Sequence, residues 1–432
     1  MSIATDVLVL GFVVSLLRQR RPVGSAIAWL LAVVLIPYVG VPLYLVFGGR
    51  KLSRRASGKR HLGSGASSKA LQGWPPTTLS RVQWLDDSVR AYQAFLSEIQ
   101  NAKHSIRILT FLVGDDETGR SLLSALTLRA REGLQVRLLI DDLLRFHAPR
   151  AAIAELLAAG ARVERFMPLV HVPFRGHGNL RNHRKIAIFD GERAIVGGMN
   201  LGQEYMGPSP DPERWRDVSL LVEGEAVAEL DAIVCADWEF ACGESLPAAI
   251  KRERGAITVQ VVPSGPDSES DPIYDADLTA IFRAERRLWI ATPYFVPDEA
   301  LLRALVIAAR RGVDVRVVSP ERSNHLLSDL ASGSCLRDLG AAGVTIRRFA
   351  RMLHAKTLLV DDSVAVVGSA NFDMRSLFLN YEIALFFSGK AEIDRLSQWF
   401  EETFADTRLG PPQAGFFRGA LDDVARLVAP QL

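Results

Sequence analysis

The chain has 432 residues, a formal net charge of +2 and 48% hydrophobic residues. That length is enough for two or three domains with sizeable cores, and the hydrophobic share is high for a purely soluble enzyme. The three cysteines form no even set, so the sequence does not require an oxidising compartment or a disulfide framework.

The apolar excess lies at the N-terminus. The 28 residues between Arg21 and Arg50 carry no charge, and about 20 apolar residues are enough to cross a bilayer as a helix. Pro37 and Pro42 interrupt the second half of this segment. We therefore expect a kinked helix, or a helix followed by a turn at the membrane interface.

A shorter apolar run precedes this segment at residues 7–17. It spans a bilayer only if residues 1–6 join it. A secretory signal peptide fits poorly, because Asp6 occupies the place where such peptides carry Lys or Arg. We predict a membrane anchor of one or two transmembrane helices in residues 1–50.

Charge is distributed unevenly along the chain. Residues 1–69 contain ten Lys/Arg and one acid, a net charge of +9, so residues 70–432 carry −7. A nucleic-acid enzyme normally has a basic working surface, so we expect no nucleic-acid partner; the basic residues beside the apolar segment suit anionic phospholipids. The larger basic cluster, Arg50–Arg60, follows that segment, and the positive-inside rule then places the catalytic region on the cytoplasmic face.

The remaining sequence divides into a linker and an α/β region. Residues 51–81 are basic and rich in Gly and Ser, which predicts a flexible linker. From residue 82 onward, helical patterns alternate with short β-branched runs. This alternation indicates α/β units with a largely buried sheet.

An internal duplication is visible within the α/β region. Residues 182–200 match residues 353–371 at a constant offset of 171. We therefore predict two duplicated α/β/α halves with pseudo-twofold symmetry, at residues 82–246 and 256–432.

Each repeat contains the pattern His-x-Lys-x4-Asp-x6-Gly-(Gly/Ser)-x-Asn. Two chance occurrences at matching places of a duplicated unit are improbable, so the signal is strong. The copies consist of His183, Lys185, Asp190, Gly197, Gly198 and Asn200, and of His354, Lys356, Asp361, Gly368, Ser369 and Asn371.

The spacing of these residues suits phosphodiester chemistry. His and Lys two positions apart on a strand point to the same face. If the halves meet, two imidazoles, two ammonium groups and two amides surround one point. Cations and amides can hold the non-bridging oxygens while one imidazole attacks phosphorus and the other protonates the leaving oxygen.

These motifs resemble the paired His-Lys-Asp signature of the phospholipase D superfamily, and the chain is similar to bacterial cardiolipin synthases over nearly its full length. The similar segments include AWLLAVVLIPYVGVPLYLVFG, NHRKIAIFDGERAIVGGMNLGQEY, WRDVSL, ATPYFVPDEALLRAL, HAKTLLVDD and GSANFDMRSLFLNYE. The resemblance implies a phosphatidyltransferase at the bacterial inner membrane that forms a covalent phosphatidyl-histidine without a metal or other cofactor. It would convert two phosphatidylglycerol molecules to cardiolipin and glycerol.

The resemblance also implies an acid downstream of each motif that hydrogen-bonds a catalytic imidazole. The matching positions are Asp217 in WRDVSL and Glu382 in NYEIAL. We expect His183 to attack phosphorus with Asp217 as its orienting acid, and His354 to protonate the leaving alcohol with Glu382 as its orienting acid.

The motif carboxylates Asp190 and Asp361 belong to the candidate catalytic set, although their place directly after a strand favours a role in holding the turn. Arg375 and Ser376 follow the second motif, where contact with a phosphate and a purely structural role are equally consistent with the sequence. Phe416 to Leu427 predicts an amphipathic helix, for which packing on the domain is favoured over lying on the membrane.

Several alternatives stay open at this level. Hydrolysis, as a phospholipase or a nuclease of the same superfamily, uses the same catalytic residues, and a non-catalytic lipid-binding scaffold is disfavoured because both motif copies are intact. His171, His177 and His183 recur every six residues, but no Cys or carboxylate completes a zinc set at the usual spacing. The second lipid (phosphatidylglycerol or phosphatidylethanolamine) and the oligomeric state are undetermined.

Overall fold

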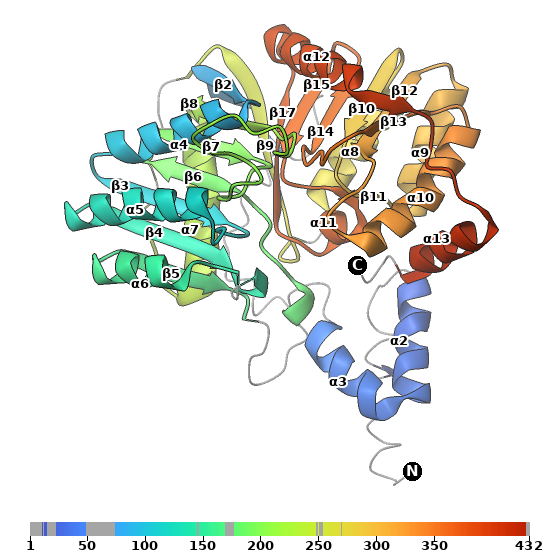
Figure 1. Cartoon of the computed structure of the whole chain (residues 1–432), viewed down its shortest axis with the longest axis horizontal. Coiled ribbons are helices and arrows are strands. Elements are labelled where there is room, and N and C mark those ends of the chain that lie inside the picture. The colour runs from blue at the N-terminus through green and yellow to red at the C-terminus, as the bar shows by residue number, and fades with distance from the viewer. Residues whose placement is uncertain are drawn as a thin grey trace.

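The computed structural model describes residues 23–48, 74–144, 147–168, 177–247, 254–268 and 270–428, together with residues 11, 13, 14 and 249. Two α/β halves lie side by side, and a pair of short helices lies below them in the view of Figure 1.

The first half is built on a seven-stranded sheet with the order β2-β8-β7-β6-β3-β4-β5. Strands β3, β4 and β5 are parallel, and the other neighbouring strands of the sheet pair antiparallel. Its elements are β2 (Arg81–Leu85), α4 (Ser88–Asn101), β3 (Ser105–Thr110), α5 (Glu117–Arg131), β4 (Gln135–Asp141), η1 (Asp142–Leu144), α6 (Arg150–Ala158), β5 (Arg162–Phe166), η2 (His177–Asn179), β6 (Ile186–Phe189), β7 (Arg193–Gly197), β8 (Ser219–Glu223) and α7 (Ala226–Cys242).

The second half repeats this strand order as β9-β17-β15-β14-β10-β12-β13 and adds β1 and β18 at the two edges. The predicted duplication is therefore confirmed in the topology of the sheets. The elements are β9 (Ile257–Ser264), α8 (Pro272–Arg283), β10 (Arg287–Ala291), β11 (Phe295–Val296), α9 (Glu299–Arg310), β12 (Asp314–Pro320), α10 (Leu326–Ala341), β13 (Thr345–Phe349), β14 (Thr357–Val360), β15 (Val364–Gly368), β16 (Phe372–Asp373), α11 (Met374–Phe378), β17 (Glu382–Phe387), α12 (Lys390–Ala405), β18 (Thr407–Leu409) and α13 (Phe416–Val428).

The two halves share one hydrophobic core. A single cluster joins residues of both sheets to α7 and α12, with Trp238 and Trp399 among its largest fully buried side chains. Each half has one further hydrophobic cluster beneath its outer helices. Because helices cover both faces of each sheet, the central strands β6 and β14 are buried along their whole length.

The predicted flexible linker ends earlier than residue 81. Thr77–Leu79 form β1, which pairs antiparallel with Ile257–Val259 at the edge of the second sheet. The side chains of Thr77 and Leu79 are buried there. A β-branched pair followed by Leu suits an edge strand, so this end of the predicted linker is ordered by pairing with the other half.

The apolar segment near the N-terminus forms two short helices instead of one long one. Helices α2 (Val23–Leu35) and α3 (Pro37–Phe47) meet at Ile36, whose backbone is not helical and which precedes a proline. They pack closely because Gly40 lies against the backbone of α2, with no room there for a Cβ atom.

None of the helices in the described residues is long and apolar enough to span a membrane. The predicted kink is present, but the predicted transmembrane span is not found in residues 23–48. Most of the run at residues 7–17 and the basic cluster Arg50–Arg60 lie outside the described residues.

Candidate active site

The two motif copies meet where the halves face each other. His183 and Lys185 immediately precede β6, and His354 and Lys356 immediately precede β14. Each of these segments forms a backbone bridge with the opposite half, since Asn182 pairs with Tyr381 and Leu353 pairs with Arg216.

Backbone hydrogen bonds fix these bridges. The amide of His183 donates to the carbonyl of Tyr381 over 2.9 Å, and the amide of His354 donates to the carbonyl of Arg216 over 2.8 Å. The residue after Tyr381 is Glu382 and the residue after Arg216 is Asp217, so each bridge places an acid of one half beside a histidine of the other.

Each imidazole is hydrogen-bonded to the acid of the opposite half. His183 Nδ1 lies 3.0 Å from Glu382 Oε1, and His354 Nδ1 lies 2.6 Å from Asp217 Oδ2. The expected pairing of His183 with Asp217 and of His354 with Glu382 is therefore wrong. The acids follow their own motifs in sequence, but the inter-half bridges carry them across the interface.

The orienting acids are themselves held in place. Glu382 accepts hydrogen bonds from the hydroxyl of Ser369 and from Asn380 Nδ2, and Asp217 accepts one from the amide of Val218 over 2.7 Å. A Cβ on Gly198 would lie 2.2 Å from Asp217 Oδ1. Glycine is thus required at this motif position in the first copy.

The motif lysines and asparagines lie in the same site. Lys185 Nζ donates to the carbonyl of His183 over 2.6 Å, and Lys356 Nζ donates to the carbonyl of His354 and lies 3.0 Å from its Nε2. Asn200 Nδ2 donates to the hydroxyl of Tyr205 over 2.9 Å. The structure brings both copies of His, Lys and Asn to one cavity wall or directly behind it.

Asp190 and Asp361 lie at the far ends of β6 and β14, away from the imidazoles. The carboxylate of Asp190 accepts from the amides of residues 103–105, and that of Asp361 accepts from the amides of residues 285–287. Both residues have positive φ angles, 55° and 49°. This geometry assigns them to holding turns and contradicts their inclusion among the catalytic groups.

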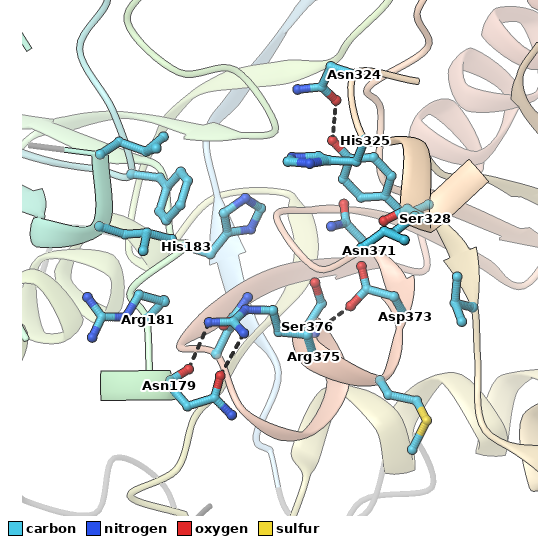
Figure 2. Close-up of a pocket in the computed structure, with 18 of the residues that line it drawn as sticks. Asn179, Arg181, His183, Asn324, His325, Ser328, Asn371, Asp373, Arg375 and Ser376 are labelled. Atoms are coloured by element: carbon cyan, nitrogen blue, oxygen red, sulfur yellow. Dashed lines mark hydrogen bonds between the residues drawn. The ribbon is translucent and has the colours of Figure 1, made fainter. Parts of the chain in front are cut away.

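The histidines open onto a cavity of about 980 Å³. Its walls come from both halves, and from α2 and α3, which contribute Trp29 and Leu43. The cavity is mostly apolar near these helices, while the side drawn in Figure 2 carries Arg375, Asn179 and other polar groups around His183. Tyr294 also lies on the cavity wall.

The aromatic surroundings of the two imidazoles differ. Phe111 packs edge-on to His183 at 5.0 Å, whereas Tyr205 and Trp215 pack on His354 at 5.0 and 5.3 Å. The side chain of His183 is 12% exposed and that of His354 is 5% exposed. Motif spacing did not identify these rings, although Trp215 lies in WRDVSL, two residues before Asp217.

Burial controls the charge of the site. It lowers the pKa of His183 to about 4, against the opposing effect of Glu382, and the pKa of His354 to about 3, with Lys356 adding to the fall. Burial also lowers the pKa of Lys356 to about 8. Although burial tends to raise it, the charges of His354 and Lys356 hold the pKa of Asp217 below its ordinary value. At neutral pH both imidazoles are uncharged.

Within the described part of the chain, no three His, Cys, Asp or Glu side chains are grouped so as to hold a metal ion. This statement does not cover the evenly spaced set His171, His177 and His183, because residues 169–176 and the side chain of His177 lie outside the described residues.

Comparison with known proteins identifies the family. A model described as "Cardiolipin synthase, PLD-like domain" matches residues 95–238 and 278–404, and one described as "Phospholipase_D-nuclease N-terminal" matches residues 7–49. The chain is 33% identical to a cardiolipin synthase of Geobacillus thermodenitrificans, covering 100% of this chain and 93% of that protein. It is 33% identical to the major cardiolipin synthase ClsA of Bacillus subtilis, covering 94% of each.

Among solved structures, phosphatidylserine synthase of Haemophilus influenzae has the same fold, with a TM-score of 0.64 at 16% identity over 83% of this chain and 97% of that one. The duplicated halves and the paired motifs define an enzyme of the phospholipase D superfamily. Within it, the chain belongs to the cardiolipin synthase family.

The crossed pairing can be checked by histidine NMR. Each Nδ1–H that donates to a carboxylate should give a strongly downfield proton signal, and Glu382→Gln should remove only the His183 signal while Asp217→Asn removes only that of His354. With pKa values of about 4 and about 3, both rings should stay neutral at about pH 5.5, where an ordinary histidine is mostly charged. Loss of the His183 signal in Asp217→Asn would contradict the pairing.

Proposed function

We propose that this protein transfers the phosphatidyl group of one phosphatidylglycerol to a hydroxyl of a second, releasing glycerol and forming cardiolipin. The observation that carries the proposal is the pair of crossed His–acid dyads on one cavity, with the motif lysines and asparagines around them. Family membership supports the lipid substrate, and the apolar walls from α2 and α3 suit acyl chains better than a nucleic acid.

In this proposal His183 is the nucleophile. Its Nδ1 is bound to Glu382, which leaves Nε2 as the attacking atom and stabilises the charge that develops on the ring. His183 is the more exposed of the two imidazoles and it is neutral at physiological pH. Attack on phosphorus breaks the bond to the glycerol oxygen and leaves a phosphatidyl group on the imidazole.

His354 serves as the general acid in the same step and as the general base in the next. Asp217 holds its Nδ1, so Nε2 can deliver a proton to the departing glycerol oxygen. Lys185, Lys356 and the two motif asparagines would hold the non-bridging phosphate oxygens and stabilise the charge that builds up on them. The apolar rings on His354 keep bulk water away from this proton transfer.

The same residues would support hydrolysis if water reached the intermediate, which makes a phospholipase D-type hydrolase the second candidate. The apolar lining of the cavity favours a lipid acceptor over water.

We propose that the face carrying α2 and α3 lies on the bacterial inner membrane, with the catalytic halves on the cytoplasmic side. Both helices expose large apolar side chains; among them Leu35 is 71% and Tyr38 77% exposed. Such a surface is costly in water and is stabilised by a bilayer. Protection of the region after Ser80 from protease outside intact spheroplasts would check the orientation.

Helix α13 extends this apolar surface. Its polar side faces α10, where Asp422 is buried and accepts from Arg337 over 2.7 Å. Its apolar side faces outward, with Phe416 86% and Phe417 88% exposed. The expected packing of this helix on the domain is present, through Asp422 and through Ala425, which is buried in a cluster with Leu330 and Ala331 of α10. In Figure 1, α13 lies next to α2, on the same side of the molecule.

The reaction is tested by incubating the purified full-length protein with phosphatidylglycerol vesicles in the presence of a chelator. Cardiolipin and glycerol should form in equal amounts, because the proposed catalytic groups are all side chains of the chain itself. Lipid products are separated by chromatography and glycerol is measured enzymatically. Phosphatidic acid as the sole lipid product would establish hydrolysis, and dependence on an added metal ion would contradict the proposed chemistry.

The roles of the histidines are tested with radiolabelled phosphatidyl donors. His183→Ala should lose turnover by at least about 10⁴-fold together with the acid-labile phosphatidyl-enzyme. His354→Ala should lose comparable turnover but still label slowly when the donor carries a leaving group that needs no protonation. Labelling of His183→Ala but not of His354→Ala would reverse the assignment.

Contact of α13 with lipid is tested with a bimane fluorophore on Phe417→Cys, in a Cys242→Ser background that removes the partly exposed native thiol. In the full-length protein on vesicles, nitroxide-bearing lipids should quench this fluorophore. The matched control is Phe282→Cys on α8, which is 53% exposed and lies at the end of the second half opposite to the cavity. Equal quenching of both fluorophores, or of neither, would contradict the proposal.

A further inference from the structure

One wall of the catalytic cavity carries a cation that the proposed mechanism does not use. Arg375, on α11, donates from Nη1 to Asn179 Oδ1 over 2.7 Å and from Nη2 to the carbonyl of Asn179 over 2.8 Å. Asn179 belongs to η2 of the other half. Figure 2 shows the guanidinium of Arg375 beside the same space into which His183 points.

Within the described part of the chain Arg375 forms no direct ion pair, although the charges of Asp373, Asp141 and Glu382 act on it. No ion pair within 4.0 Å involves it among the described residues, whereas the neighbouring buried arginines Arg181 and Arg184 each contact an aspartate. Burial and the nearby charge of Arg181 lower the pKa of Arg375. Asp373, one of the acids whose charge acts on Arg375, has its own pKa raised by burial. A cation kept in a partly buried place without a counter-ion is unfavourable unless a ligand supplies the anion.

The position in the first half that corresponds to Arg375 carries a different charge. Strand β16 pairs Phe372 with Phe295, and the matching bridge in the first half joins Leu201 to Val113. Arg375, three residues after Phe372, therefore corresponds to Glu204, three residues after Leu201. The cation is present on one side of the pseudo-twofold axis only.

The same correspondence explains why there is space beside His183. Ser376 corresponds to Tyr205, whose ring packs on His354. Because Ser376 is small, this position places no ring beside His183, whose aromatic neighbour among the described residues is Phe111. The duplicated site thus has one aromatic, closed side and one open side that carries a positive charge.

We propose that Arg375, oriented by Asn179, binds the phosphodiester of the acceptor lipid and so places its glycerol hydroxyl against the phosphatidyl-histidine. This inference rests on the proposed transferase function. The reacting phosphate already uses the motif lysines and asparagines, so a second phosphodiester three carbons away needs a separate cation. Among the described residues of the open wall, Arg375 is the guanidinium that forms no direct ion pair, whereas Arg181 contacts Asp141.

The transfer step forms one bond to phosphorus and breaks another. The acceptor hydroxyl oxygen forms a bond to phosphorus, the bond from phosphorus to His183 Nε2 breaks, and its electron pair returns to the imidazole. The hydroxyl proton passes to His354, which gave up a proton in the first step. Both histidines return to their starting states, and the product carries one phosphate in the motif site and one on Arg375.

The Arg375 subsite would also favour transfer to a lipid over hydrolysis by water. Water carries no phosphate and gains nothing from Arg375, whereas an anionic acceptor is held in position for attack. A site that uses a charged hydrogen-bonding group discriminates strongly against an acceptor that lacks the matching group.

The test compares acceptors within one reaction. Vesicles of labelled phosphatidylglycerol are supplied with ethanol, and cardiolipin, phosphatidylethanol and phosphatidic acid are measured together. In Arg375→Gln the ratio of cardiolipin to phosphatidylethanol should fall about ten- to hundredfold, the loss expected for a charge-assisted contact to phosphate. Arg375→Lys should recover part of the ratio, because it restores the charge without the forked geometry.

The matched control is Arg322→Gln, which removes an exposed arginine two residues from Asn324 at the cavity wall and should leave the ratio unchanged. If Arg375→Gln reduces all three products in parallel, or leaves the ratio at the wild-type value, Arg375 is only a structural tether and the subsite is wrong. If the wild-type protein makes no cardiolipin at all, the proposed transferase function fails instead. Formation of the labelled phosphatidyl-enzyme by Arg375→Gln shows that the variant is folded.

Discussion

The catalytic centre depends on two backbone bridges between the halves. Where Asn182 pairs with Tyr381 and Leu353 pairs with Arg216, the chain of one half is hydrogen-bonded to the chain of the other. In each bridge, the next residue on one segment is a histidine and the next residue on the other segment is an acid. Each dyad therefore takes one residue from each half, and neither half contains a complete dyad. A change that weakens the core shared by α7 and α12 would therefore act on both dyads at once.

The same bridges bury the charges that the chemistry uses. Asp217 and Glu382 stay ionised at neutral pH while both imidazoles are neutral, and Lys356, whose pKa burial lowers to about 8, supplies part of the opposing charge. An anionic phosphodiester added to this set favours protonation of an imidazole, because it brings a negative charge into a poorly solvated place. In the proposed mechanism, the general acid would then take up its proton when the substrate binds. This coupling reconciles histidines of low pKa with a mechanism that requires one of them to be protonated.

Much of this arrangement could be predicted from the sequence. The duplication predicted two equivalent halves, and the strand orders are the same; the motif spacing predicted that His, Lys and Asn would meet. The pairing of acids with histidines could not be predicted. Motif spacing describes each half separately, and it contains no information on which residues of one half contact the other half. The length of the apolar segment likewise did not reveal that Pro37 and Gly40 fold it into two packed helices. The repeat did not predict the ring of Tyr205 on His354 either, because the corresponding residue of the second half is Ser376.

The duplication supplies symmetry, but a transferase needs its two lipids to be treated differently. Two equal half-sites would bind two phosphates equally, with no reason for one to react and the other to accept. Two differences between the halves lie where this matters: Tyr205 corresponds to Ser376, and Glu204 corresponds to Arg375. The residues that form the dyads are equivalent in the two halves, because each histidine needs a hydrogen-bonded acid and a buried environment. Divergence in the loops after the motif asparagines leaves that shared core intact and lets one side of the cavity specialise for a second anionic group.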